Sequence, residues 1–319
     1  MVLDEFGIIK KYFQQAHHSR TDVILGSGDD CAVLTPPIGQ ELVMTIDTLL
    51  LGRHFLASID PADLAYKAIA VSLSDIAAMG GEPAWALVSL SLEVADQAWL
   101  EHFAQGAFEI LKAHGVALVG GDFTRGPLSV TSQLSGFVPK GQAIPRSGAK
   151  VGDKIFVTGT LGDAGLALSD QLGEVSLDPL IKNLVYPRLL RPSARVAEGL
   201  ALRTLASAAI DISDGLVADL GHIVKQSGVG AQILVESLPL SQALQALPLE
   251  QALPLALSAG EDYELCFTLA PEQEVAMKAF MPVSTAVTCI GHIVAQQGIE
   301  LIKSDGTLYH CHSSGYLHF

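Results

Sequence analysis

Aspartates that follow apolar segments are the residues best suited to chemistry in this sequence. They are flanked by Gly, Ser or Thr, and they are Asp29, Asp30, Asp47, Asp75, Asp122, Asp211 and Asp214. One such aspartate commonly caps a helix or a turn, but that role does not explain so many in one chain. Converging carboxylates repel one another unless cations hold them, and Mg²⁺ prefers oxygen ligands, including phosphate oxygens. The pattern therefore predicts a site for several Mg²⁺ ions and a polyphosphate.

Two glycine-rich segments could supply the phosphate-binding backbone of such a site. Gly120-Gly121-Asp122 and the run from Thr158 to Gly165 place amide groups near expected helix starts, where anions bind. The sequence has no GxxxxGKS/T motif, no GxGxxG after a strand and no GxSxG elbow. These absences exclude a P-loop enzyme, a dinucleotide-binding fingerprint and an elbow-type serine hydrolase.

The charge balance limits the possible partners. The chain has 319 residues, of which 34 are acidic and 19 are basic, and its formal net charge is −15. Such an acidic surface repels nucleic acid and anionic lipid, so we expect neither as a partner. The charge-free run at residues 279–299 contains Pro282 and several polar residues, which makes it a poor membrane span. No signal peptide is visible, and four scattered cysteines indicate reduced thiols, so we expect a cytoplasmic protein.

The elements that must position these residues follow an α/β pattern in both halves of the chain. In the first half, the sequence predicts strands at 42–46, 85–92, 116–119 and 128–138, and helices at 61–79 and 96–114. Residues 139–153 are rich in Gly, Pro, Lys and Arg and indicate a crossing between domains. In the second half it predicts strands at 154–158, 265–269 and 288–294, and helices at 163–172, at 188–209 beyond Pro192, and at 217–226. We therefore expect two α/β domains, residues 1–140 and 141–319.

An ordered set of short motifs spans the chain from near residue 26 to its last residue. The motifs are Gly28-Asp-Asp-Cys-Ala-Val33, Ile46-Asp-Thr-Leu-Leu-Leu-Gly-Arg-His-Phe55, Ala70-Val-Ser-Leu-Ser-Asp-Ile-Ala-Ala-Met-Gly-Gly81, Gly120-Gly-Asp-Phe-Thr-Arg125, Arg146-Ser-Gly-Ala-Lys-Val-Gly-Asp153, Asp211-Ile-Ser-Asp-Gly-Leu216, Gly260-Glu-Asp-Tyr-Glu-Leu265 and Gly315-Tyr-Leu-His-Phe319. Each motif alone is weakly specific, but the ordered set is highly specific. It resembles the thiamine-monophosphate kinase family, in a superfamily with aminoimidazole ribonucleotide synthetase and selenophosphate synthetase.

The resemblance implies a fold and a reaction. Family members are similar in having an N-terminal α/β domain, which dimerises through its mixed sheet and carries metal and ATP ligands. Their C-terminal α/β domain completes the nucleotide and substrate cleft. The implied enzyme is a homodimeric phosphotransferase that uses Mg²⁺ and ATP as cofactor and co-substrate. It passes the γ-phosphoryl group of ATP directly, in line, to thiamine monophosphate, and the product is thiamine diphosphate.

The resemblance also implies roles for single residues. The implied Mg²⁺ ligands are Asp30, Thr45, Ile46, Asp47, Asp75, Asp122, Asp211 and Asp214. The implied ATP contacts are Gly120, Gly121, Arg146 and Ser213, and the implied substrate contacts are His54, Glu261 and Tyr316. Two positions depart from the family pattern. Ile46 lacks the usual hydroxyl and could ligate only through its backbone carbonyl, and His114 stands where relatives carry an aromatic residue near the adenine.

The chemistry requires little of the protein beyond charge and alignment. The acceptor phosphate oxygen is deprotonated near neutral pH, so neither a strong general base nor a covalent phospho-enzyme is needed. Two other functions stay open at this point. One is another ATP-using activity of the superfamily, such as a selenophosphate or aminoimidazole ribonucleotide synthetase, and the other is a non-catalytic nucleotide-binding protein.

Two further segments can be interpreted in either of two ways. Arg188, Arg191 and Arg195 recur at helical spacing and indicate a salt-bridged or solvated face more than a phosphate site. Glu261 and Asp262 could form a solvated loop, but we expect substrate contact there, because a glycine precedes them and a strand follows.

Overall fold

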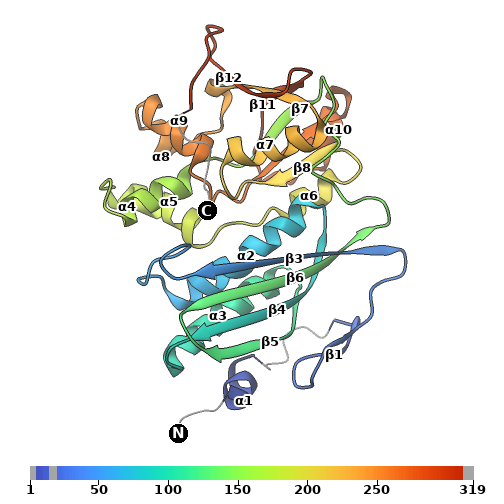
Figure 1. Ribbon diagram of the computed structural model, residues 1–319, viewed down its shortest axis with the longest axis vertical. Helices are drawn as coiled ribbons and strands as arrows, with labels where there is room; N and C mark the ends of the chain where they lie inside the picture. The colour runs from blue at the N-terminus through green and yellow to red at the C-terminus, as the bar shows by residue number, and fades with distance from the viewer. Residues whose placement is uncertain (1–4, 14–19, 312–319) are drawn as a thin grey trace. The chain divides into compact units, whose positions relative to one another are not determined.

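Two sheets, each with its own helices, organise the chain (Figure 1). The computed structural model describes residues 5–13 and 20–311. The chain divides into a first unit, Met1–Ile76 with Gly81–Gly141, and a second unit, Ala77–Gly80 with Gln142–Phe319. Both units are α/β, as the sequence predicts. Among the described residues, no helix is both long enough and apolar enough to cross a membrane.

The first unit begins with short elements and continues into a four-stranded sheet. In chain order it contains α1 (Glu5–Ile8), the π-helical turn η1 (Ile9–Phe13), β1 (Val23–Leu25), β2 (Val33–Leu34), β3 (Gln40–Leu50), α2 (Pro61–Ala78), β4 (Glu82–Leu92), α3 (Gln97–Ala113), β5 (Ala117–Arg125) and β6 (Ser129–Pro139).

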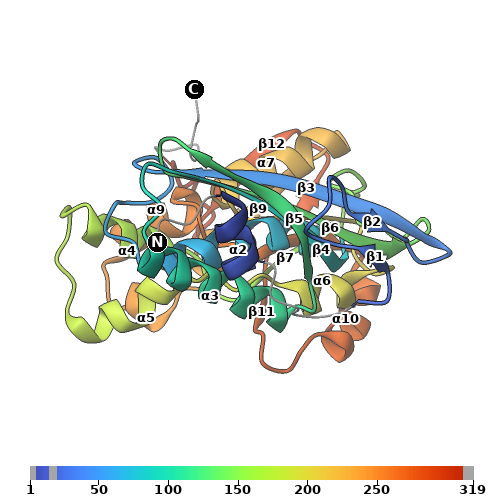
Figure 2. The same ribbon diagram turned by 90° about the horizontal axis from the view of Figure 1, so that it is seen from below.

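The sheet of the first unit is mixed, with strand order β3-β6-β4-β5. β6 pairs antiparallel with β3 and β4, whereas β4 and β5 are parallel. Helices α2 and α3 cover one face (Figure 2). The row formed by Leu49, Val130 and Leu90 is buried on that face. Because strand side chains alternate, Asp47 lies on the same face as Leu49.

The opposite face of this sheet is partly covered by the β1–β2 hairpin. Trp85 and Phe137 form an edge-to-face aromatic pair there, with ring centroids 4.9 Å apart. Val23 and Leu34 of the hairpin pack against them. The Trp85 indole N–H donates to Asp22 at 3.1 Å, which ties the start of the hairpin to the sheet.

The second unit contains a six-stranded sheet and most of the helices. In chain order it contains β7 (Lys154–Thr158), α4 (Asp163–Gln171), α5 (Pro179–Leu190), α6 (Val196–Leu202), β8 (Ala208–Asp211), α7 (Leu216–Ser227), β9 (Gly230–Leu234), the 3₁₀ turn η2 (Val235–Ser237), α8 (Gln242–Gln245), α9 (Leu249–Ser258), β10 (Leu265–Leu269), the 3₁₀ turn η3 (Pro271–Gln273), α10 (Glu274–Phe280), β11 (Val287–Val294) and β12 (Gly298–Ile302).

This second sheet has helices on both faces. Its strand order is β12-β9-β11-β7-β10-β8, and only the β12–β9 pair is parallel among the described strands. Side chains of one strand alternate between two hydrophobic clusters. Ile155 and Val157 pack with α7 and α9 residues, whereas Phe156 packs with α6 and α10 residues. The sheet is therefore buried on both sides.

Several predictions of secondary structure agree with the structure, and others do not. The strands at 154–158 and 265–269 are confirmed residue for residue. The helix predicted beyond Pro192 within 188–209 is confirmed only in part, because α6 spans only Val196–Leu202 and β8 begins at Ala208. Pro192 separates it from α5, which ends at Leu190, since the residue before a proline disfavours helical backbone.

The prediction that aspartates follow the ends of strands is also wrong at two positions. Asp47 lies inside β3 and Asp122 lies inside β5. β3 continues beyond Asp47 because its backbone stays paired with β6 as far as Leu50. The length of an apolar run in the sequence therefore underestimates the length of a strand that continues through polar residues, because those residues still pair with the neighbouring strand.

Candidate functional site

Asp47 and Asp75 form the acidic pair of the first unit. Asp47 comes from β3, and Asp75 comes from α2, which packs on that face of the sheet. Each carboxylate accepts one hydroxyl: Ser72 Oγ donates to Asp47 Oδ2 at 2.7 Å, and Thr45 Oγ1 donates to Asp75 Oδ2. Thr45 lies two residues from Asp47 on one face of β3, and Ser72 lies three residues from Asp75 on one side of α2.

Electrostatics at this pair favour a bound cation. Burial, and after it the negative charge of Asp75, raise the pKa of Asp47 to about 6, although the Ser72 hydrogen bond opposes both effects. The donors are two carboxylates and two hydroxyls, an all-oxygen set that suits Mg²⁺. A divalent cation would relieve the repulsion that raises this pKa. The residues present therefore fit the metal that the sequence predicts.

The structure does not bring every predicted metal ligand of the first unit to this pair. Asp122 belongs to β5, at the other edge of the sheet from β3, and pairs there with Ser89 of β4. Three strand spacings of about 4.8 Å separate the two strands, roughly 14 Å. Asp30 is exposed in the turn between β1 and β2, and the Ile46 side chain points to the sheet face opposite Asp47.

No preformed metal centre is present in the part of the chain that the structure describes. Within residues 5–13 and 20–311, no group of three or more His, Cys, Asp or Glu side chains is arranged to hold a metal ion. The oxygen atoms of a nucleotide would therefore have to complete any Mg²⁺ coordination.

In the second unit, Asp211, Ser213 and Asp214 lie where β8 leads into α7. Asp211 is the buried last residue of β8, and the loop of residues 212–215 follows it. The Ser213 amide donates to Asp219 Oδ2 at 3.0 Å, and the Ser213 carbonyl accepts the Glu261 amide at 2.8 Å. The Ser213 backbone is therefore already paired, so only its hydroxyl could contact a nucleotide.

The loop that carries Glu261 is strained and is tied to the Ser213 loop. Glu261 and Tyr263 have φ angles of 61° and 49°, which are uncommon for residues other than glycine. The Tyr263 amide donates to the Ile212 carbonyl at 2.8 Å, beside the bond between Glu261 and Ser213. Strain of this kind persists where surrounding bonds enforce it, and it concentrates at functional sites. Glu261 is thus held beside Ser213.

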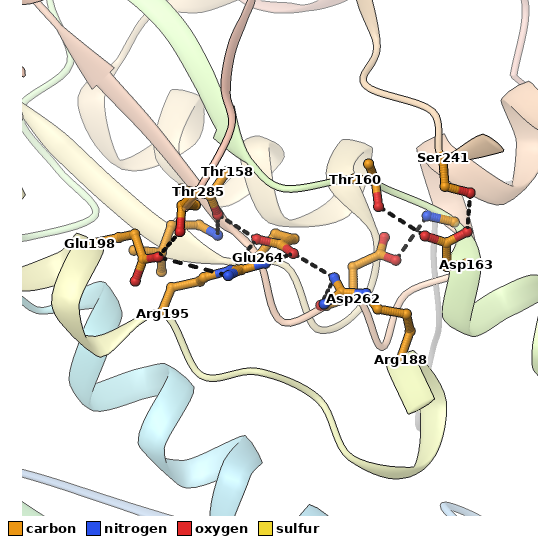
Figure 3. Close-up of polar contacts among 12 residues, drawn as sticks. Thr158, Thr160, Asp163, Arg188, Arg195, Glu198, Ser241, Asp262, Glu264 and Thr285 are labelled. Atoms are coloured by element: carbon orange, nitrogen blue, oxygen red, sulfur yellow. Dashed lines mark hydrogen bonds and ion pairs between the residues drawn. The ribbon is translucent and has the colours of Figure 1, made fainter. Parts of the chain in front are cut away.

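Glu264 is the buried centre of the polar network beneath this loop (Figure 3). Arg188 donates to its Oε1 at 2.5 Å, and Arg195 donates to both oxygens at 2.6 Å. Thr158 Oγ1 adds a hydrogen bond at 2.6 Å. A Cβ on Gly159 would lie 2.1 Å from the Glu264 carboxylate, which explains the glycine there. The salt-bridge interpretation of these arginines is confirmed.

Asp262 is buried next to this network and is not part of a solvated loop. The Gly162 amide donates to its Oδ1 at 2.8 Å. Burial raises the pKa of Asp262 well above its ordinary value. The Gly162 hydrogen bond and the charge of Arg188 oppose this rise, whereas the charges of Glu264 and Asp163 add to it. The solvated interpretation is therefore wrong for Asp262, since its side chain is part of the interior.

The glycine-rich segments do not form the phosphate cradles that the sequence predicts. In the segment from Thr158 to Gly165, the amides of Gly159, Leu161 and Gly162 donate to Ala286, Pro239 and Asp262. Figure 3 shows the same segment holding Asp163, which accepts hydroxyls from Thr160 and Ser241 at 2.8 and 2.5 Å. Protein groups therefore occupy the amides that a phosphate would need.

Gly120 and Gly121 also differ from the prediction, because they lie inside β5 and not near a helix start. A Cβ on Gly121 would lie 1.9 Å from the Val88 carbonyl oxygen of the adjacent parallel strand. The close approach of two strands is thus sufficient to explain the glycine.

The remaining predicted residues are placed singly. His54 Nδ1 accepts the Leu50 amide at 3.0 Å, which makes Nε2 the protonated nitrogen of the neutral ring. Arg146 is exposed in the second unit. His114 caps the C-terminus of α3, and burial lowers its pKa. Tyr316 lies outside the described residues.

Sequence reasoning missed Asp219 and Glu264. Both are acidic residues whose partners are backbone amides or arginines, and Glu264 lies 76 residues after Arg188. The only available signal was the helical spacing of the arginines, which predicted ion pairs without naming the acid.

Two family models match the chain, one for each half. The N-terminal domain of AIR synthase related proteins matches residues 28–138, and the C-terminal domain matches residues 150–304. Together they cover most of the sequence and both sheets. The fold and the matches define an AIR synthase-related protein.

Comparison with individual proteins identifies the family more closely. Thiamine-monophosphate kinase of Escherichia coli (strain K12) is 50% identical over 324 residues, which cover 100% of this chain and 99% of that protein. The crystal structure of thiamine-monophosphate kinase from Stenotrophomonas maltophilia K279a has a TM-score of 0.85 at 44% identity, covering 91% of this chain and 93% of that one. AaThiL complexed with AMPPCP and TMP has a TM-score of 0.78 at 34% identity, covering 89% of both chains. This chain belongs to the thiamine-monophosphate kinase family.

We expect Asp47→Asn to damage chemistry more than folding. The substitution keeps the side-chain size and an oxygen for Ser72, but it removes a charge that repels Asp75. The melting temperature without ligands should stay equal or rise. The rise with Mg²⁺ and ATP should be smaller than in the parent, and turnover should fall about 10²-fold or more. Melting curves and rates measure all three effects.

The matched control for this experiment is Asp96→Ala. Asp96 caps α3 by accepting the Trp99 amide at 2.8 Å, which is a purely structural role. Its loss should cost about 1 kcal/mol of stability and leave the rise with Mg²⁺ and ATP intact. If Asp47→Asn also lost stability, kept the full rise in melting temperature with Mg²⁺ and ATP, and had normal activity, Asp47 would be structural and the metal assignment would be wrong.

We expect Asp262→Asn to stabilise the protein increasingly as the pH rises. Folding raises the pKa of Asp262. Asp262 therefore adds to the free energy of unfolding below its unfolded-state pKa of about 4, and this stabilisation is lost as the pH rises toward its folded-state pKa. The difference in melting temperature between Asp262→Asn and the parent should therefore grow from pH 4.5 to pH 7.5. Thermal denaturation without ligands at several pH values measures it.

Asp170→Asn is the control of opposite sign. Hydrogen bonds from Lys182 and Tyr186 lower the pKa of Asp170 to about 2. Its contribution is therefore present above the unfolded pKa and is lost only as the pH falls toward 2. Asp170→Asn should be less stable than the parent by an amount that hardly changes between pH 4.5 and pH 7.5. A flat difference for Asp262→Asn would show that Asp262 is not destabilised by ionisation.

Proposed function

We propose that this chain, an ATP-dependent phosphotransferase of the thiamine-monophosphate kinase family, transfers the γ-phosphoryl group of ATP directly to the phosphate of thiamine monophosphate. The product is thiamine diphosphate. The structural observation that carries the proposal is the repelling Asp47–Asp75 pair with its hydroxyl donors. AaThiL, which is 34% identical, was solved with AMPPCP and TMP, which supports the choice of a nucleotide and a second phosphorylated ligand.

Mg²⁺ is the proposed cofactor, and carboxylates of both units are its proposed ligands. Several ions are proposed. In the first unit, Asp47, Asp75 and the Thr45 hydroxyl would hold one, and Asp30, the Ile46 carbonyl and Asp122 would contact others. In the second unit, Asp211 and Asp214 would be ligands. When bound, Mg²⁺ supplies positive charge that neutralises phosphate oxygens and stabilises charge on the transferring group. The acidic chain, with a net charge of −15, needs that charge to attract two anionic reactants.

The residues of the chain itself position and align the reactants. Asp47 and Asp75 are held by hydroxyl hydrogen bonds, so their oxygens point in defined directions before any ligand arrives. The acceptor phosphate oxygen needs no base, and the loose transition state of phosphoryl transfer depends mainly on alignment and charge. No side chain forms a covalent intermediate in this proposal.

The remaining proposed ligand contacts are those that the resemblance to the family implies. Arg146 would contact ATP through its exposed guanidinium, and Ser213 would do so through its hydroxyl. Gly120 and Gly121 would contact ATP through their backbone. Glu261 and the His54 Nε2–H would contact the thiamine substrate, as would Tyr316.

We propose a homodimer that forms through the sheet of the first unit. β3 is an edge strand, and its side chains Leu42, Met44 and Ile46 are 46%, 62% and 65% exposed on one face. Leu87 of β4 is also exposed, and both it and Ile46 lie opposite Gln133 of β6. An exposed apolar strip on an edge strand favours association, and a two-fold pairing would bury it against its copy.

We further propose a cytoplasmic location and no nucleic-acid partner. All four cysteines are free thiols, which supports a reducing compartment. The excess of acidic over basic residues disfavours binding to nucleic acid.

The decisive test of the function is product formation. The protein is incubated with ATP, Mg²⁺ and thiamine monophosphate, and the products are separated by chromatography. We expect thiamine diphosphate to form only when ATP and Mg²⁺ are both present, with little use of unphosphorylated thiamine, because the acceptor is a phosphate oxygen. Better turnover of thiamine, or turnover of selenide or an amide substrate, would contradict the proposal.

The dimer is tested by Met44→Lys, which places a charge in the exposed apolar strip. We expect light scattering to give twice the chain mass for the parent at micromolar concentration, and the mass of one chain for Met44→Lys. Ile38→Lys is the control, because Ile38 is fully exposed in the first unit but lies in the turn before β3. A parent protein with the mass of a single chain would refute the dimer.

A further inference from the structure

Asp219 makes an unusual set of contacts on the first turns of α7. The residue is only 3% exposed. Its Oδ2 accepts the amides of Ser213, Asp214 and Gly215 at 3.0, 3.0 and 3.1 Å. Gly215, which precedes α7, has no side chain that could cap the helix. A single carboxyl oxygen therefore collects three successive backbone donors at the start of the helix.

Three successive amides that converge on one point form an anion-binding concavity, of the kind that often holds a phosphate. Here the chain's own carboxyl group fills it. The loop from Ile212 to Gly215 thus gains a fixed internal partner and cannot also bind an external anion through these amides. Without Asp219, three buried or half-buried donors would lose their partner, and each loss is costly.

The carbonyl side of the same loop is fixed as well. The Ile212 and Ser213 carbonyls accept the amides of Tyr263 and Glu261, both at 2.8 Å. Asp219 thus holds the amide side of the loop, and the Glu261 segment holds the carbonyl side. The backbone is clamped between them, and the side chains of Ser213 and Asp214 extend from a rigid frame.

We infer that Asp219 is a positioning residue for the metal-binding carboxylate of Asp214, acting through the three loop amides. This inference rests on the proposed function, because it takes Asp214 to be a Mg²⁺ ligand. Residues that orient the ligands of a metal typically change metal affinity or activity by 10- to 100-fold when they are replaced. Asp219 itself contacts no reactant in this role.

The test uses variants that distinguish the loss of the acceptor oxygen from a general loss of stability. Asp219→Leu removes every acceptor at similar volume, and Asp219→Asn keeps one carbonyl oxygen for the amides. Asp170→Asn is the matched control: Asp170 is also a buried acceptor in the second unit, and it binds the Leu177 amide and the Tyr186 hydroxyl. Asp214→Asn tests the underlying ligand assignment. If Asp219→Leu cannot be recovered folded, Asp219→Ala, which admits water, replaces it.

Electron paramagnetic resonance measures the binding of Mn²⁺ to the full-length protein in the presence of AMPPCP. Steady-state kinetics gives kcat and KM for Mg-ATP. We expect the Mn²⁺ dissociation constant to rise about 10- to 100-fold in Asp219→Leu or Asp219→Ala. It should stay within about threefold of the parent in Asp219→Asn, because a carbonyl oxygen can still accept the amides. Asp170→Asn should bind Mn²⁺ like the parent even if it melts at a lower temperature.

Each outcome has a separate meaning. If Asp214→Asn bound Mn²⁺ as tightly as the parent, the proposed metal role of Asp214 would fail. If Asp214→Asn weakened binding but folded Asp219→Leu or Asp219→Ala did not, the positioning role would be wrong while the proposed function stood. Asp219→Asn as weak as Asp219→Leu would also overturn the inference, since the acceptor oxygen would then not matter.

Discussion

The repulsion between Asp47 and Asp75 is the constraint on which the architecture of the first unit depends. The two carboxylates share a half-buried space, and burial together with the charge of Asp75 raises the pKa of Asp47 to about 6. Such a pair persists because its two supports are stiff. β3 is paired along its whole length with β6, and α2 is buried among apolar side chains. The fold thus stores an unfavourable interaction that a cation can relieve.

In the second unit, buried acidic residues are paired with arginines or with backbone amides. Arg188 and Arg195 neutralise Glu264, and backbone amides satisfy Asp219. Breaking a buried ion pair by removing one partner is strongly destabilising, so this network fixes the strand and loop that lead to Glu261. Glu264 and Asp219 thus hold loops of the second unit, whereas Asp47 and Asp75 are two nearby carboxylates that a divalent cation would stabilise.

Local patterns predicted much of this structure, and long-range pairing explains what they missed. β7 and β10 are short apolar runs between turns, so their bounds could be read directly. The sequence predicts that the strand ends before Asp47, because it does not show that β6 continues the pairing beyond that residue. The partners of Glu264 lie about 70 residues away in the chain, and no local spacing specifies them. Nor does local spacing specify the acceptors of the amides in the glycine-rich turn, because these acceptors lie far away in the chain.

The most direct test of the account is a carboxyl NMR titration of Asp47. The central claim is that burial and Asp75 together hold the ionised form of Asp47 at a disadvantage, which Mg²⁺ removes. In protein freed of divalent ions, the account predicts a pKa of about 6 for Asp47. With saturating Mg²⁺ and AMPPCP, that pKa should fall below the ordinary value for aspartate. An ordinary pKa in the metal-free protein, or a raised pKa that Mg²⁺ leaves unchanged, would contradict it.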